Sequence, residues 1–110
     1  MSDSPTEVVI EPVWLIEATY APDAAETRVP YRARHLARLA ELKDAGVVVE
    51  AGGYADVSAS IIVLRAPDEA AALAVVQDDV YMANGVWVEL RARPFGRVVT
   101  SGSDSGAAGS

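Results

Sequence analysis

Residues 46–64 read GVVVEAGGYADVSASIIVL, and this stretch carries the pattern that best predicts the fold. The valine-rich run 47–51 is typical of a strand, and residues 52–56, GGYAD, are typical of a turn. A second strand-favouring run, SIIVL, follows at 60–64. The stretch therefore predicts a β-hairpin in the middle of the chain.

One strand and one helix are predicted before the hairpin. Residues 13–20, VWLIEATY, are rich in the aromatic and β-branched residues that favour strands. Pro30 can stand in the first turn of a helix, and Gly46 is placed to end that helix. Between them lies the apolar stripe that a core-facing helix needs, made of Leu36, Leu39 and Leu42.

A second helix and a last strand are predicted after the hairpin. Pro67 and the two acidic residues that follow it suit the first turn of a helix, where the helix dipole favours negative charge. The alanine-rich run 70–74 continues that helix. Residues 86–90, VWVEL, alternate as a strand does, and Arg-Pro-Phe at 93–95 is expected to end it.

The predicted order of elements is therefore βαββαβ. This order is typical of an α+β, ferredoxin-like fold, in which two helices cover one face of an antiparallel sheet. The strand at 13–20 presents apolar side chains to both faces, with Trp14 and Ile16 on one and Val13 and Leu15 on the other. Because two short helices cover only one face, we expect the other to meet a second copy, forming a dimeric α/β barrel.

The length and the ends of the chain suggest one domain. The 110 residues, 11.6 kDa, suit a single core. We expect a flexible N-terminal tail at 1–12, a domain at 13–99 and a flexible C-terminal tail at 100–110, the last because small residues dominate it. The acidic start lacks the charge and apolar run of a secretory signal, so we expect a cytoplasmic protein.

Composition argues against several classes of partner. Nine Lys and Arg against sixteen Asp and Glu give a net charge of -7, which disfavours binding to nucleic acid or to an anionic membrane surface. The chain has no cysteine and one histidine, a poor ligand set for a transition metal, so we expect no metal and no cofactor. The partners that we expect are a small molecule and a second copy of the chain.

Polar residues begin the apolar side of the helix that starts near Pro30. On a helical wheel Arg32 and His35 share the side of the leucines, whereas Arg38 is expected on the opposite side. Burying an arginine or an imidazole without a partner costs several kcal/mol on a rough scale, so an acidic group is expected nearby. Asp78 and Asp79, just after the second helix, are the candidates.

The pair of His35 and Asp79 is the sharpest functional hypothesis. An imidazole held by a carboxylate can accept or donate a proton near neutral pH, and the carboxylate sets its tautomer. The alternative is a histidine that only fills or caps the domain. Three further residues are candidates for substrate binding, each with a structural alternative: Arg32 for a carboxylate or phenolate, Ser60 as a hydrogen-bond donor and Tyr81 in an aromatic wall.

The order and spacing of several motifs resemble the YCII-related family over most of residues 13–99. The resemblance is carried by RARHLARL at 32–39, Gly46, Gly52, Ser60, Asp-Val-Tyr at 79–81, Gly85 and Arg-Pro-Phe at 93–95. It implies the dimeric ferredoxin-like fold and a site that pairs His35 with Asp79. The chain departs from the family pattern at Val80, where proline is usual, and at Ala59, where glycine is common.

Two classes of function follow. The first is a cofactor-independent enzyme in which His35, oriented by Asp79, moves a proton on a small cyclic or aromatic substrate, as an isomerase, lyase or dehydrochlorinase does. The second is a non-catalytic module that binds a small molecule in the same cleft, for instance in regulation. A purely structural dimer is a third possibility.

Overall fold

The computed structural model describes residues 7–100. Its elements are, in chain order, β1 (Val8–Tyr20), α1 (Ala24–Thr27), the 3-10 helix η1 (Val29–Tyr31), α2 (Arg32–Asp44), β2 (Val48–Gly53), β3 (Ala59–Leu64), α3 (Glu69–Gln77), α4 (Val80–Ala83) and β4 (Trp87–Thr100). Within this part of the chain, no helix is both long and apolar enough to cross a bilayer.

The four strands form one antiparallel sheet in the order β2-β3-β1-β4. The central strand β1 pairs with β3 on one side, where Trp14 lies opposite Leu64, and with β4 on the other, where Tyr20 lies opposite Trp87. This topology confirms the predicted α+β, ferredoxin-like fold.

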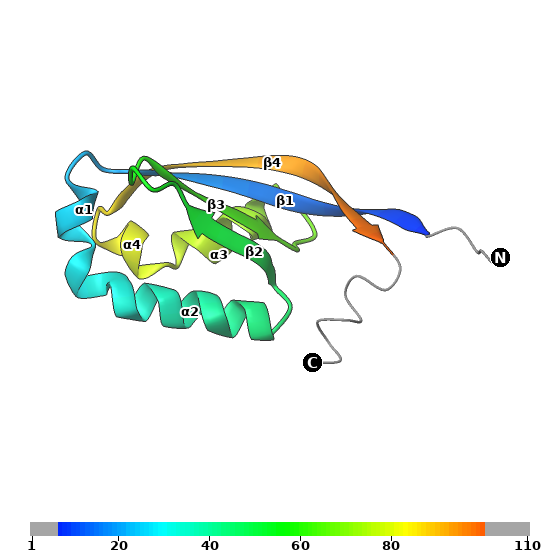
Figure 1. Ribbon diagram of the computed structural model, residues 1–110, viewed down its shortest axis with the longest axis horizontal. Coiled ribbons are helices and arrows are strands. Elements are labelled where there is room, and N and C mark those ends of the chain that lie inside the picture. The colour runs from blue at the N-terminus through cyan, green and yellow to red at the C-terminus, as the bar shows by residue number, and fades with distance from the viewer. Residues whose placement is uncertain (1–6, 101–110) are drawn as a thin grey trace.

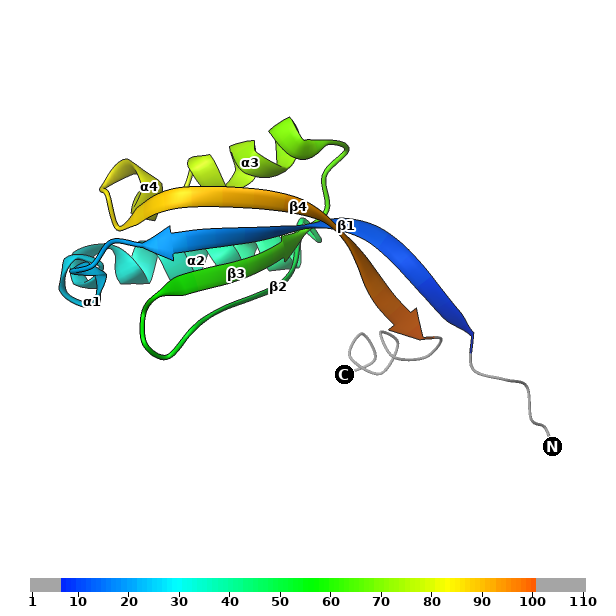
Figure 2. The same ribbon diagram turned by 90° about the horizontal axis from the view of Figure 1, so that it is seen from above.

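The helices gather on one side of the sheet (Figure 1), whereas Figure 2 turns its other side to the viewer. Helix α2 packs against β2, and α3 packs against β4 and β1. The core between helices and sheet is apolar and includes Ile16, Ala18, Ile62, Leu64, Ala72, Val76, Val86 and Trp87. The predicted arrangement of helices on one face is therefore present.

The ends of both long helices lie close to the predicted ones, although Pro30 lies in η1 before α2, and Pro67 and Asp68 precede α3. The Asp68 side chain caps α3 by accepting a 2.8 Å hydrogen bond from the Ala71 amide. After α2, Gly46 has a φ of 79°, and the Val47 amide donates to the Leu42 carbonyl at 2.9 Å. This is a Schellman turn, in which a residue without a Cβ takes the left-handed conformation at least cost.

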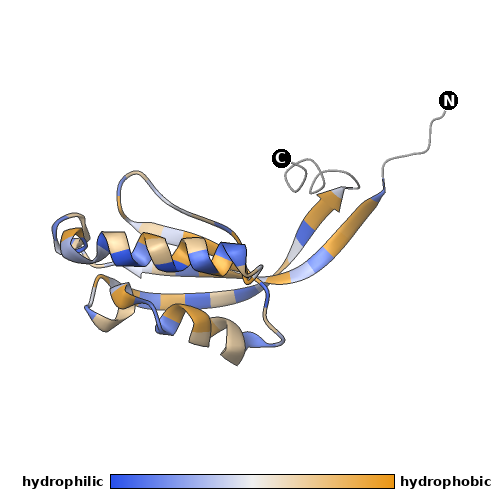
Figure 3. Cartoon of the chain, turned by 90° about the horizontal axis from the view of Figure 1, so that it is seen from below, coloured by the Kyte–Doolittle hydropathy of each residue, from blue (hydrophilic) through white to orange (hydrophobic). Residues whose placement is uncertain are grey.

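Strands β1 and β4 are longer than predicted. Residues 8–12, which we expected in a flexible tail, pair with residues 96–100, so the strand begins at Val8 and not at residue 13. Residues 93–95 do not end the last strand, because β4 is an edge strand, where the missing N–H of Pro94 need not break a ladder bond. The paired ends project as a largely hydrophobic ribbon (Figure 3). The remaining tail residues, 1–6 and 101–110, lie outside the described residues.

Candidate active site

His35 and Asp79 meet in the interior of the domain. His35 lies on the first turns of α2, and Asp79 directly precedes α4. The His35 Nδ1 and Asp79 Oδ1 atoms are 2.8 Å apart, and the two residues are only 5% and 1% exposed. The acidic partner that the helical pattern called for is therefore Asp79, while its neighbour Asp78 is exposed.

The backbone of α4 holds the Asp79 carboxylate in place. Asp79 has an extended backbone, with ψ of 144°, and its Oδ1 accepts a 2.9 Å hydrogen bond from the Tyr81 amide, as an N-cap does. Val80 stands where the resembling family usually has proline, and the cap forms without it. One oxygen thus accepts from both the helix end and the imidazole, which fixes the carboxylate by two hydrogen bonds.

Arg38 is a site residue that the sequence reasoning missed. Its Nη1 is 3.5 Å from Asp79 Oδ2, and its Nη2 donates to the Val75 carbonyl at 2.7 Å. We expected Arg38 to face away from the core, and for Arg32 an ion pair with Asp78 or Asp79 was the alternative to substrate binding. Within residues 7–100, however, no ion pair joins Arg32 to either aspartate. The sequence pattern that could have identified Arg38 is its i, i+3 spacing from His35, because side chains three residues apart are neighbours on one side of a helix.

Aromatic rings hold the imidazole on two sides. The Tyr81 ring stacks on His35 with centroids 3.8 Å apart and planes 12° apart, and Trp87 meets it edge-on at 5.2 Å.

The contact with Asp79 also sets the tautomer of the imidazole. Because a carboxylate only accepts hydrogen bonds, the 2.8 Å contact places the proton on Nδ1. In the neutral imidazole the Nε2 atom then carries the lone pair, and no hydrogen bond to Nε2 is formed within the described chain. It is free to act as a base.

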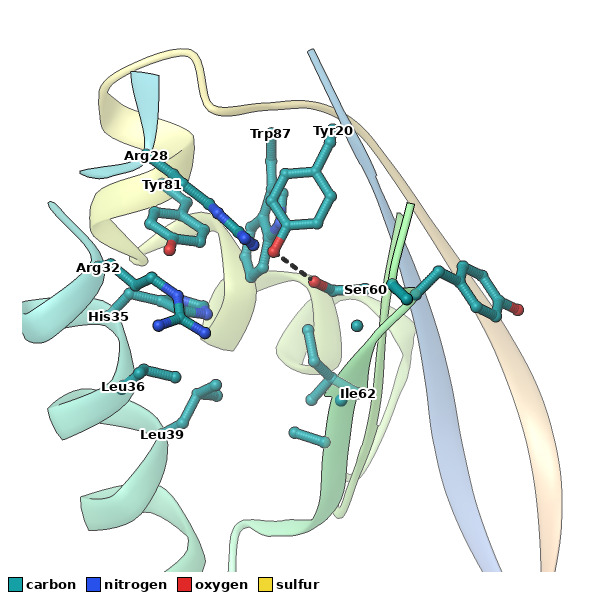
Figure 4. A pocket seen from close by; sticks show the side chains of 15 residues that line it. Tyr20, Arg28, Arg32, His35, Leu36, Leu39, Ser60, Ile62, Tyr81 and Trp87 are labelled. Atoms are coloured by element: carbon teal, nitrogen blue, oxygen red, sulfur yellow. Dashed lines mark hydrogen bonds between the residues drawn. The ribbon is translucent and has the colours of Figure 1, made fainter. Parts of the chain in front are cut away.

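A pocket of about 290 Å³ opens beside His35 (Figure 4). Helix α2 supplies Arg32 and His35 to its wall, Arg28 precedes η1, and the sheet side includes Ser60. Among residues 7–100 no aspartate or glutamate lines it, although the whole chain carries a net charge of -7. The pocket is therefore a positively charged site on an acidic protein, suited to an anionic ligand.

Ser60 and Tyr20 form a hydrogen-bonded pair in this pocket. The Ser60 hydroxyl donates to the Tyr20 hydroxyl oxygen at 3.0 Å, from β3 to the end of β1. The sequence predicted Ser60 as a candidate and treated Tyr20 only as one of several aromatic residues. The structure thus brings His35, Asp79, Arg32, Ser60 and Tyr81 into one region, and adds Arg28, Arg38 and Tyr20 to them.

Comparison with known proteins identifies the family of the domain that carries this site. The model of the YCII-related domain matches residues 13–96. The chain belongs to the YCII-related family. That match contains every residue of the site named above.

A solved structure shares the fold of this YCII-related protein. It is 5-chloro-2-hydroxyhydroquinone dehydrochlorinase from Burkholderia phenoliruptrix, in complex with 2,5-dihydroxybenzoquinone. The likeness has a TM-score of 0.64 at 21% identity and covers 76% of this chain and 92% of the dehydrochlorinase chain. A search of curated proteins found no match.

Within residues 7–100, three polar atoms of this YCII-related site are buried without a hydrogen-bond partner, and one of them, Asp79 Oδ2, has Arg38 Nη1 at 3.5 Å. Neither the Tyr81 hydroxyl nor the Trp87 indole nitrogen has a hydrogen-bond partner within residues 7–100. Burial raises the pKa of the Tyr81 hydroxyl above its ordinary value, since the charged phenolate would lose its hydration. Both residues line the pocket, so both groups lie next to the space that a ligand would enter.

The described part of the YCII-related domain offers no obvious metal site. No group of three or more His, Cys, Asp or Glu side chains lies close enough together there to hold a metal ion. The residues at the pocket are instead arginines, aromatic residues, a serine and the histidine of the pair. Such a set can bind an organic anion and move a proton.

Proposed function

We propose that this protein is a cofactor-independent enzyme that moves a proton on a small cyclic or aromatic substrate. His35 is the base, acting through Nε2, and Asp79 orients the imidazole. The observation that carries the proposal is the 2.8 Å contact between two buried ionisable groups, of which His35 lines the pocket and Asp79 lies behind it. Buried, paired titratable groups of this kind cluster at functional sites.

The geometry suits general acid–base catalysis. When Nε2 takes a proton from the substrate, the imidazole becomes positively charged, and the Asp79 carboxylate stabilises that charge through Nδ1. The stacked Tyr81 ring and the edge of Trp87 keep the imidazole plane from rotating away from the substrate. Arg38 balances the charge of Asp79 from the other side of the carboxylate.

The pocket favours a planar anion. Two guanidinium groups, of Arg28 and Arg32, line it without an acidic neighbour among its lining residues. A guanidinium presents a planar set of donors that fits a carboxylate or a phenolate. A cavity of about 290 Å³ is of a size for one substituted ring. The proposed substrate is therefore a small ring compound with at least one acidic oxygen.

The fold neighbour supports this substrate class. The name of the dehydrochlorinase describes a hydroxylated, chlorinated aromatic ring, and its bound quinone is also a planar ring with acidic hydroxyl groups. At 21% identity the likeness carries the fold, so the exact ring and its leaving group are left to experiment. Elimination and isomerisation both begin with the same step, which is removal of a proton by a base.

The test is proton exchange in heavy water. Hydroxylated quinones, phenols and lactones are incubated with the protein in D2O, and loss of the exchangeable C–H signal is followed by NMR. We expect one class to exchange in the presence of the wild type, and exchange to fall by about 10²-fold or more in His35→Gln. Binding detected by thermal shift, with no proton exchange for any compound of the panel, would instead assign a non-catalytic module that binds a small molecule.

We also propose a homodimer that joins the uncovered sheet faces. That face carries the cross-strand pair Leu15 and Val63, with Ile61 beside them, and none of the helices covers it (Figure 2). A chain of this size seldom leaves such a surface in water. Light scattering should give twice the mass of one chain, and Val63→Asp should shift it toward the mass of one chain. A single-chain mass for the wild type at micromolar concentration would contradict the dimer.

A further inference from the structure

We propose that Tyr20 is a second functional residue of this site, a donor that stabilises negative charge on the substrate. This role of Tyr20 rests on the proposed function of His35, since the negative charge on the substrate develops when His35 removes a proton. The Tyr20 hydroxyl donates a hydrogen bond to the substrate oxygen that becomes negative. Ser60 acts as a positioning residue for that hydroxyl.

The first observation is the placement of Tyr20 across the pocket from His35. Tyr20 ends β1 and lines the pocket from the sheet side, while His35 lines it from α2 (Figure 4). The Tyr20 ring is held by Tyr81, with centroids 6.1 Å apart, and by Trp87, at 6.5 Å. It is 8% exposed. A ring bound between the two walls would have the base on one side and the phenol on the other.

The second observation is the direction of the hydrogen bond from Ser60. Its hydroxyl donates to the Tyr20 oxygen at 3.0 Å, so that oxygen is the acceptor and its own proton is left to donate. Within residues 7–100 the Tyr20 hydroxyl has no acceptor. An unused donor in a buried site is costly, and a ligand oxygen in the pocket would satisfy it.

The third observation is the environment of the hydrogen-bonded Tyr20 and Ser60 side chains. The Arg28 guanidinium carbon lies 5.8 Å from the centre of the Tyr20 ring, and both residues line the pocket, so a positive charge stands at the same wall as the proposed donor. Gly53 leaves the pair open to the pocket. A methyl group at Gly53 would lie 3.5 Å from the Ser60 hydroxyl and 3.9 Å from that of Tyr20, in the space beside both.

The chemical step balances without any further reagent. A substrate C–H bond next to a carbonyl breaks, and the proton passes to His35 Nε2. The electron pair of that bond forms a C=C bond, and the carbonyl π electrons move to the oxygen, giving an enolate. Tyr20 keeps its proton and donates a hydrogen bond to the enolate oxygen. The imidazolium then returns the proton to carbon or oxygen, or the enolate expels a leaving group.

The experiment measures the binding of a phenolate, which resembles the enolate in charge. The probe is 4-nitrophenol, whose ionised and neutral forms differ in colour, with nitrobenzene as the probe that lacks the oxygen. Tyr20→Phe should weaken binding of the phenolate about tenfold or more and leave nitrobenzene binding unchanged. Tyr31→Phe, at a tyrosine outside the pocket, is the matched control and should bind both probes as the wild type does.

Ser60 and the fold are tested with two more variants. Ser60→Ala should reduce the ionised fraction of bound nitrophenol, a readout that a purely structural role would not move. Tyr20→Phe leaves the buried Ser60 hydroxyl without its partner, which can destabilise the domain. The double variant Tyr20→Phe with Ser60→Ala removes both partners, so it should recover stability while phenolate binding stays weak.

The outcomes separate this inference from the proposed function. If His35→Gln abolishes proton exchange but Tyr20→Phe binds the phenolate as the wild type does, the role of Tyr20 is wrong and the His35 proposal stands. If Tyr20 controls phenolate binding but no substrate exchanges a proton, the donor role stands and the enzyme proposal fails. Absence of phenolate binding to the wild type would overturn the role of Tyr20, whatever exchange shows.

Discussion

The imidazole of His35 and the carboxylate of Asp79 are 44 residues apart in sequence and 2.8 Å apart in space. One belongs to α2 and the other caps the single turn of α4. The pair depends on the contact between α2 and the start of α4, so its integrity reports on the local fold as well as on chemistry. The predictions below separate these two contributions.

Replacing Asp79 with Asn should impair activity far more than stability. Asparagine can still cap α4, but it no longer requires the proton to sit on Nδ1 of His35. We expect proton exchange to fall by roughly 10²- to 10⁴-fold, with a loss of about 1–3 kcal/mol in unfolding free energy. Because the chain has one histidine, the ring nitrogen NMR shifts report the tautomer without ambiguity.

The control for this change is Asp78→Asn, at the exposed neighbour. Asp78→Asn alters the charge by the same amount and should leave the rate of substrate proton exchange and the ring nitrogen NMR shifts of His35 unchanged. An Asp79→Asn variant with wild-type exchange would show that the carboxylate does not orient the base.

Replacing Arg38 with Met should destabilise the domain around Asp79. The change leaves Asp79 Oδ2 without its nearest cation and the Val75 carbonyl without its 2.7 Å donor. Since the arginine is partly exposed, solvent screens part of the effect, and we expect a loss of about 1–2 kcal/mol in urea unfolding. Arg34→Met on the same helix, where the side chain is exposed, should cost much less. Equal losses of unfolding free energy in both variants would show that Arg38 does not hold Asp79 in place.

Replacing Tyr81 with Phe should maintain or raise stability and change the response to alkaline pH. The variant keeps the ring that stacks on His35 and removes a buried hydroxyl that has no hydrogen-bond partner within residues 7–100. We expect a gain of zero to about 1 kcal/mol in unfolding free energy at neutral pH.

The alkaline effect of Tyr81 follows from the raised pKa of its hydroxyl, which burial causes. Stability from the neutral phenol is complete below the unfolded pKa of about 10 and is lost as pH rises through the folded value. The wild type should therefore weaken more steeply than Tyr81→Phe above pH of about 10 in urea titrations. Parallel curves for the two proteins would contradict a buried Tyr81 hydroxyl.

Glu11 should stabilise the projecting ribbon in a pH-dependent way. A hydrogen bond from Arg65, opposed by desolvation and aided by Arg97, lowers the pKa of the Glu11 carboxyl. Arg97 also donates to Glu11 at 2.9 Å across the β1 and β4 pairing. With a lowered folded pKa, the contribution is present above the unfolded pKa of about 4.5 and is lost as pH falls through the folded value.

Hydrogen exchange in residues 8–12 and 96–100 can measure this contribution. At neutral pH the amides there should exchange faster in Glu11→Gln than in the wild type, by an amount equivalent to about 1 kcal/mol or less. At acidic pH, below the folded pKa, the two proteins should exchange alike. Glu7→Gln serves as the control, at an exposed acid that no ion pair joins within the described chain.

The sequence by itself determined the order of the strands and longer helices and pointed to His35 with Asp78 or Asp79 as its partner. Hydrophobic period, turn residues and helix end signals such as Asp68 and Gly46 are local properties, so they predict local structure well. His35 and Asp79 stood out because ionisable residues on or beside apolar helix faces need partners. The short helices α1 and α4, of four residues each, were missed because one turn leaves little periodic signal.

Only the tertiary structure decided which groups surround the pair. The contact of Arg38 with Asp79 and the hydrogen bond from Ser60 to Tyr20 join separate elements, and no local pattern encodes such distances. The extension of β1 back to Val8 likewise depends on the partner strand β4, since an isolated two-stranded pairing has little stability of its own. These contacts depend on pairing and packing between segments that are far apart in sequence, and for that reason local sequence patterns could not predict them.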